Sequence, residues 1–143
     1  MIEPPEESVQ RALAAAGIEI FRTRSGEILI ADRIRMHLMD SGVRVLVGAT
    51  PSVRVTVRSQ RSDFPTASSA DLFSKVRDAM APLVASRGFV EVLADARRIT
   101  DPVDATHVLD VWHELTYEKA VPQLDAIVEE VRWALGLSKC ITG

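Results

Sequence analysis

The stretch IEIFRTRSGEILIADRIRMHLMDSGVRVLVGATPSVRVTVRSQ, residues 18–60, decides the fold. Its apolar residues recur mostly at every second position, in three runs: Ile28, Ile30, Ile34, Met36 and Leu38; Val43, Val45 and Val47; Val53, Val55 and Val57. A period of two is typical of strands that bury one face. Short turn-rich segments separate the runs, at 24–27, 40–42 and 50–52. The pattern therefore predicts four strands, 18–24, 28–38, 43–47 and 53–59, in an antiparallel meander.

Helical patterns flank this block on both sides. Residues 5–16 carry a narrow apolar stripe, and a wider stripe from Leu72 to Val84 predicts a second helix that Ser68 or Ser69 caps and that ends at Gly88. Pro82 predicts a kink or a restart within the second helix. A third helix follows Pro122 and is expected to stop at Gly136. Between the last two helices the period returns to two, which predicts strands at 89–99 and 107–121 around a loop at 100–104.

The resulting order, α-ββββ-α-ββ-α, predicts an α+β fold in which helices pack on one face of an antiparallel meander sheet. The chain of 143 residues has no internal repeat or linker, so a single domain over 1–143 is expected. Its one cysteine, Cys140, excludes an internal disulfide and reads as an incidental thiol. With no long apolar run and an acidic, proline-containing start, the sequence predicts a cytoplasmic protein without membrane contact.

Charge is unevenly distributed along the chain. Residues 18–61 hold eight arginines and four acids, a local charge of +4, whereas 62–143 hold eight basic and thirteen acidic residues, a local charge of −5. Alternation places many of the basic side chains on one sheet face: Arg33, Arg35, His37, Arg44, Arg54 and Arg58. Like charges on adjacent strands repel one another unless acids or an anionic partner intervene. This face is therefore either an ordinary solvated surface, a site for an acidic protein, or a phosphate-contacting surface without the aromatics that base stacking needs.

Signatures of catalysis are absent from the sequence. It contains no phosphate-binding glycine loop, no zinc-protease pattern and no nucleophile elbow, and His37, His107 and His113 have no metal-ligand spacing. No enzyme activity, metal or cofactor is expected. His113 lies centrally on an apolar strand face and is interpreted as a hydrogen-bonded core histidine, with a pH-sensitive or ligand-contacting role as the alternative.

Two tryptophans are candidates for partner contact. Trp112 lies on the polar face of its strand between Asp110 and Glu114, and Trp133 lies at the margin of the apolar stripe of the third helix. Each is either covered by neighbouring elements or serves as an interface anchor, a role in which tryptophan is enriched. The predicted partner-binding residues are Trp112, Trp133, Arg33, Arg35, Arg44, Arg54 and Arg58.

The segments Ile18-Glu19-Ile20 and Ser25 to Asp32, followed by the strand to Leu38 and by Val43–Val47, resemble the small α+β fold of type III secretion chaperones and YbjN-like proteins. The resemblance lies in element order. The apparent extra strand at 53–59 and the basic sheet face depart from it. It implies a homodimer that binds an extended segment of another protein without catalysis.

These observations lead to one main hypothesis and one alternative. The main hypothesis is a non-enzymatic protein-binding module, chaperone-like or adaptor-like, that forms a homo-oligomer. The alternative is an anion or nucleic-acid binder that uses the arginine-rich sheet face.

Overall fold

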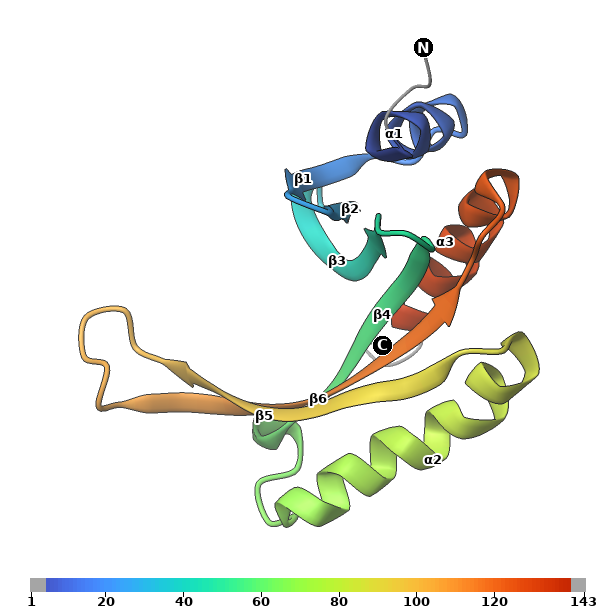
Figure 1. Cartoon of the computed structure of the whole chain (residues 1–143). Coiled ribbons are helices and arrows are strands. Elements are labelled where there is room, and N and C mark those ends of the chain that lie inside the picture. Colours follow the sequence, from blue (N-terminus) through green and yellow to red (C-terminus); the bar gives the residue numbers. More distant parts are fainter. Residues whose placement is uncertain (1–4, 140–143) are drawn as a thin grey trace. The chain divides into compact units, whose positions relative to one another are not determined.

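A computed structural model describes residues 5–139 of the chain (Figure 1). Cys140 and the first four residues lie outside the described residues, so the interpretation of Cys140 as an incidental thiol stays a prediction. The elements are α1 (Pro5–Ala15), β1 (Ile20–Arg24), β2 (Glu27–Ile34), β3 (His37–Leu46), β4 (Ser52–Gln60), η1 (Arg61–Asp63), α2 (Ser69–Arg87), β5 (Val90–Thr100), β6 (Val108–Ala120) and α3 (Leu124–Lys139). This order confirms the predicted α+β fold, a six-stranded antiparallel sheet with three helices.

The strands are hydrogen-bonded in the order β1-β2-β3-β4-β6-β5, so β1 and β5 are the two edges of the sheet. The chain divides into two compact units. One comprises residues up to 55 together with those from 118 onward, and the other comprises residues 56–117. Strands β4 and β6 pass from one unit to the other. The expected single domain over 1–143 stays a prediction.

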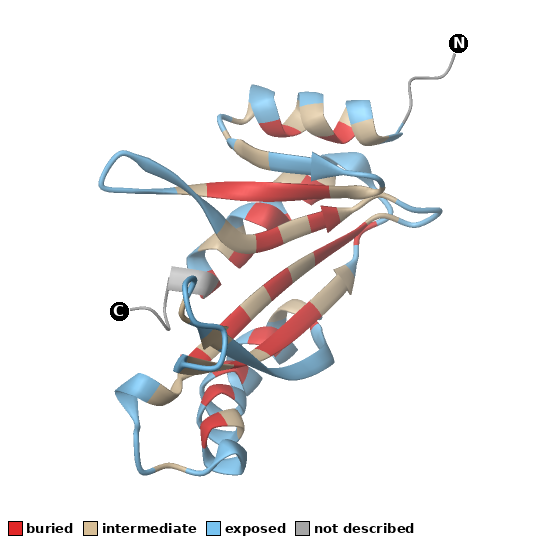
Figure 2. Ribbon diagram, turned by 90° about the vertical axis from the view of Figure 1, so that its left-hand side faces the viewer, coloured by how far each residue is buried: buried red, intermediate tan, exposed pale blue. Residues whose placement is uncertain are grey.

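The first unit is built from β1, β2, β3 and parts of β4 and β6, with α3 packed against β3 and α1 against α3 and β1. Its core consists of alternate strand residues and of helix residues spaced three or four apart. These are Val9, Leu13, Ile28, Ile30, Val43, Val45, Val53, Val55, Ile127, Val131 and Ala134, all of which are buried (Figure 2). The apolar strand faces and the apolar helix stripes that the sequence predicts therefore pack together in one core.

In the second unit, α2 packs against β5, and the end of the β5–β6 hairpin that carries residues 101–107 projects beyond the helix (Figure 1). Ser68 caps α2 by accepting a hydrogen bond from the backbone N–H of Asp71, and Gly88 ends it in the left-handed conformation, as the sequence predicts. Leu72, Val76 and Met80 form the buried stripe of α2.

Two local predictions about the strands are wrong. The segment 28–38 is not one strand. Strand β2 ends at Ile34, a two-residue turn follows at Arg35 and Met36, and β3 begins at His37. Apolar alternation continues through this turn and so conceals it. The Asp40-Ser41-Gly42 segment, predicted as a turn, is a bulge within β3.

The bulge has its own hydrogen bonds. Asp40 Oδ1 accepts from the N–H of Gly42, and Ser41 Oγ donates to the carbonyl of Ile30 at 2.7 Å. Gly42 has a φ of 83°, which favours glycine.

The remaining corrections concern the helices. Gly136 does not end α3, which continues to Lys139, since the apolar stripe extends to the buried Leu137. Helix α2 runs through Pro82 as one helix, so the predicted restart does not occur, and the predicted kink stays a prediction. Among residues 5–139, no helix is long and apolar enough to cross a membrane.

Candidate functional site

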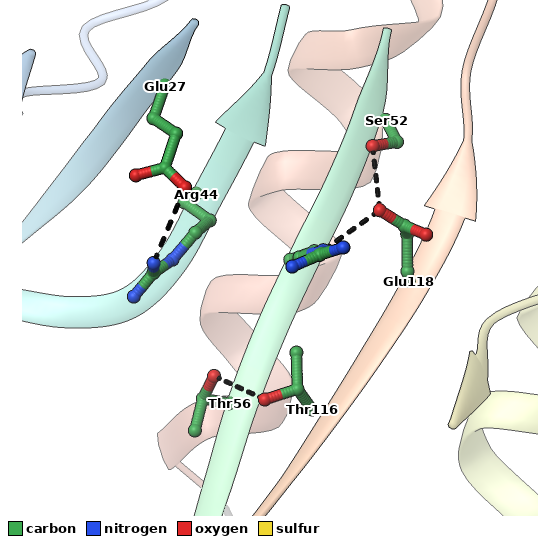
Figure 3. Close-up of polar contacts among 7 residues, drawn as sticks. Glu27, Arg44, Ser52, Thr56, Thr116 and Glu118 are labelled. Carbon is green, nitrogen blue, oxygen red and sulfur yellow. Dashed lines mark hydrogen bonds and ion pairs between the residues drawn. The ribbon is translucent and has the colours of Figure 1, made fainter. Parts of the chain in front are cut away.

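A row of four charged side chains crosses the sheet in the first unit (Figure 3). Arg44 of β3 and Arg54 of β4 are direct cross-strand neighbours. An acid flanks each of them: Glu27 Oε1 lies 3.9 Å from Arg44 Nη1, and Glu118 Oε1 lies 2.9 Å from Arg54 Nε. We call Glu27, Arg44, Arg54 and Glu118 the charged row.

The charged row neutralises its own arginines. Adjacent guanidinium groups on neighbouring strands repel each other, and the two outer carboxylates offset that repulsion. The hydrogen bond from Arg54 lowers the pKa of Glu118 against the opposing effect of burial, and Ser52 Oγ donates a further hydrogen bond at 3.0 Å. Either acids or an anionic partner can offset the repulsion between the two arginines. In this row the chain itself provides the acids.

Replacing Glu118 by Gln is expected to lower the free energy of unfolding by about 1 kcal/mol. Without its carboxylate, Arg54 loses its ion-pair partner while Arg44 remains directly opposite. The loss should be larger in low salt than in high salt, because screening weakens the repulsion between the two arginines. Urea denaturation at two ionic strengths measures it.

The matched control for that substitution is Glu114→Gln, on the same strand and the same strand face, where no ion pair is found among residues 5–139. Its unfolding free energy should stay within about 0.5 kcal/mol of the unchanged protein. Equal effects of the two substitutions would contradict the role assigned to Glu118.

The turn between β2 and β3 exposes a cluster of large apolar side chains. Met36 is 90% exposed, Ile34 54%, Met39 47% and Leu38 40%. We call these four residues the hairpin tip. Arg35 and Met36, the two turn residues, have φ values of 51° and 71°. Positive φ at both positions is the requirement of a type I′ hairpin turn, and asparagine and glycine adopt it far more readily than arginine or methionine.

Arg33 lies next to the hairpin tip and is held by an acid. Its Nε and Nη2 donate to the two carboxylate oxygens of Glu19 at 2.6 and 2.8 Å. This paired hydrogen bond lowers the pKa of Glu19 and raises that of Arg33. Arg35, in contrast, is exposed and has no ion-pair partner among residues 5–139.

In the second unit, Trp112 is half-buried beneath an arginine. The Cζ atom of Arg58 lies 3.8 Å from the centroid of a Trp112 ring, and Arg97 approaches the indole at 5.7 Å. Such stacking is favourable for guanidinium groups.

Asp110, two residues before Trp112, accepts hydrogen bonds from the N–H and Oγ of Ser62. Burial acts to raise the pKa of Asp110, but these hydrogen bonds outweigh burial and lower the pKa. Thr56 and Thr116 share a hydrogen bond at 3.0 Å (Figure 3).

His113 is a fully buried core residue. Its Nε2 shares a hydrogen bond of 3.0 Å with Ser69 Oγ, and its ring makes an edge-to-face contact with Phe73 at 4.9 Å between centroids. Burial, followed by the charge of Arg61, lowers the pKa of the imidazole. The ring is therefore neutral at pH 7, as its structural interpretation requires.

The predicted partner-binding residues are distributed over both units, and their role in partner contact stays a prediction. Arg33 and Arg35 lie at the β2–β3 turn, Arg44 and Arg54 belong to the charged row, and Trp133 is half-buried on α3. Arg58 and Trp112 pair in the second unit. No cluster of histidine, cysteine or carboxylate side chains suited to a metal ion occurs within residues 5–139.

Sequence reasoning missed two features, the apolar hairpin tip and the exposure of β5. A run of Ile, Met and Leu beside charged residues is also what a buried strand shows, so the tip has no separate signal. In β5, Val90 and Val92 predict a covered face but are 62% and 42% exposed. The chain matches no protein-family model, no curated protein and no solved structure.

Proposed function

We propose that this protein is a non-enzymatic protein-binding module, chaperone-like or adaptor-like, that acts as a homo-oligomer in the cytoplasm. The observation that carries the proposal is the hairpin tip, where Met36 is exposed on the turn, Ile34 and Met39 on one face of the hairpin, and Leu38 on the other. A concentration of large exposed apolar side chains in one short segment is typical of a site that contacts another protein.

The composition of the hairpin tip favours an apolar segment of another protein as its partner. Methionine side chains are flexible and polarizable, so Met36 and Met39 can adapt to ligands of different shapes. The unpaired Arg35 beside them favours a segment that also carries acidic residues. The backbone strain at the turn keeps these side chains at the most accessible point of the hairpin.

The alternative, an anion or nucleic-acid binder, has weaker support. Arg33, Arg44 and Arg54 each have a carboxylate partner in the same chain. Binding a phosphate there would require breaking these ion pairs. We therefore do not extend the proposal to nucleic acid.

Affinity capture from the native source, with and without nuclease, tests the proposal through one matched pair of substitutions. Met36→Ser removes the most exposed side chain of the hairpin tip, and Val103→Ser removes a side chain that is 97% exposed in the β5–β6 loop. We expect a protein that survives nuclease to be recovered with the unchanged chain and with Val103→Ser, and to fall at least ~10-fold with Met36→Ser. The purified pair should then reproduce this difference in a binding titration.

Two results would contradict the proposal. One is equal recovery with Met36→Ser and Val103→Ser. The other is recovery of nucleic acid that is lost with salt, which would favour the arginine-based alternative instead.

A further inference from the structure

Strand β5 is an edge strand whose side chains are largely exposed, although α2 packs against one part of it. Its eleven residues are all exposed except Ile99, which is half-buried, and β6 is its only neighbour in the sheet (Figure 2). The outer backbone N–H and carbonyl groups of β5 therefore have no partner strand within residues 5–139. Long edges of this kind readily pair with another strand unless proline, a bulge or uniform charge prevents it. β5 contains no proline, and its charges have both signs.

The sequence of β5 is complementary to itself. In an antiparallel pair with two-fold symmetry, a residue lies opposite its own copy at the axis, and the others pair at equal distances on either side. With Ala96 at the axis, Asp95 lies opposite Arg97 of the second copy, and Leu93 lies opposite Ile99. The charged contact and the apolar contact then both occur twice.

Neighbouring registers are less favourable. An axis at Asp95 places two carboxylates face to face, and an axis at Arg97 or Arg98 places two guanidinium groups face to face. An axis at Ala94 sets Leu93 opposite Asp95. It also places Arg97 opposite Glu91 of the second copy, so Glu91 would have to be its ion-pair partner. Glu91 is already held by Arg77 of α2, at 2.7 Å and 3.1 Å, and this hydrogen bond lowers the pKa of its carboxyl group.

The side chains that the favoured register uses are available. Neither Asp95 nor Arg97 has an ion-pair partner among the residues that the structure describes, and Arg97 makes only its contact with Trp112 at 5.7 Å. Leu93 is 55% exposed and Val92 is 42% exposed. Pairing would cover both apolar side chains and satisfy the outer backbone groups of β5.

We propose that β5 is the self-association surface of this protein, where it pairs antiparallel with β5 of a second copy around a two-fold axis at Ala96. This deepens the proposed function, because it rests on the homo-oligomer and assigns its interface. It also leaves the hairpin tip, in the other unit, for a different protein.

Charge exchange between two variants tests the pairing. Asp95→Arg and Arg97→Asp each place like charges opposite each other in a homodimer. Sedimentation velocity over a micromolar range should show a dimer for the unchanged chain and a dimer dissociation constant raised ~100-fold in each variant, about tenfold for each of the two symmetric contacts. Mixed in equal amounts, the two variants should regain a dimer, since opposite charges then face each other.

Cysteine cross-linking tests the register independently of charge. In a Cys140→Ser background, Ala96→Cys places two thiols on the axis, at a Cα separation of ~4.5–5.5 Å that a disulfide can span. Ala94→Cys is the control, because position 94 faces position 98. Mild oxidation should cross-link the first variant and leave the second monomeric in denaturing electrophoresis.

A monomer throughout the concentration range would overturn the proposal, as would a dimer that neither charge variant weakens or equal cross-linking of both cysteine variants. These outcomes are separable from failure of the proposed function. Capture of another protein through Met36 is measured on the charge variants, whose hairpin tip is unchanged.

Discussion

Replacing His113 by Ala is expected to lower the free energy of unfolding by about 2–4 kcal/mol, the largest effect of any single substitution considered. The ring is fully buried, so its removal leaves a cavity against Phe73 and removes the shorter hydrogen bond of Ser69 Oγ, which keeps only the one from Arg61 Nη2 at 3.4 Å. Chemical denaturation measures the loss. His107→Ala, in the exposed β5–β6 loop, should change the unfolding free energy by less than about 0.5 kcal/mol.

The same residue makes stability depend on pH. Burial lowers the pKa of His113 in the folded state, so the unfolded chain binds this proton more readily. Stability should therefore be full above the unfolded pKa of about 6.5 and decline as the pH falls below it, by at most about 1.4 kcal/mol per pH unit for one group. His113→Gln should flatten this decline between pH 7 and pH 5, and His107→Gln should not. A decline unchanged by His113→Gln would contradict the assignment.

Sequence periodicity predicted most of the fold because each amphipathic element buries one face. Its failures in the sheet have a common physical origin in turns and edges. The β2–β3 turn consists of Arg35 and Met36, whose side chains carry no turn signal, and its positive φ values are imposed by pairing of the flanking strands. Glycine at position 42 is a turn signal, yet it forms a bulge because β3 continues on both sides.

The candidate site was predictable only in part. Alternation placed Arg44 and Arg54 on one strand face and led to the interpretation of His113 as a hydrogen-bonded core residue, as the structure has them. The carboxylates that pair with these arginines come from β2 and β6, and the pairing depends on strand order, which single-strand periodicity does not contain. The exposure of β5 is likewise a property of its place at the sheet edge.

Replacing Arg35-Met36 by Asn-Gly is expected to separate stability from binding. Both new residues adopt positive φ without the strain that arginine and methionine bear, so the free energy of unfolding should rise by about 1–2 kcal/mol. The same change removes Met36, the most exposed side chain of the hairpin tip, and the unpaired guanidinium of Arg35 beside it. Partner capture should therefore fall at least ~10-fold. Thermal denaturation and the capture experiment measure the two effects.

The outcome discriminates between two meanings of the strained turn. A more stable protein that no longer captures its partner indicates that the strain is retained for display of the tip. A more stable protein with full capture would show that Arg35 and Met36 take no part in binding. Asn-Gly variants that lose stability would contradict the account of the turn itself.

The most direct test of the central claim, that the hairpin tip binds another protein, is photo-cross-linking in cells of the native source. A photoreactive amino acid is incorporated at position 36 in one variant and at position 103 in another, both at highly exposed apolar sites. We expect one protein to be cross-linked reproducibly from position 36 and not from position 103. Equal products from the two positions, or no cross-linked protein from position 36, would contradict the claim.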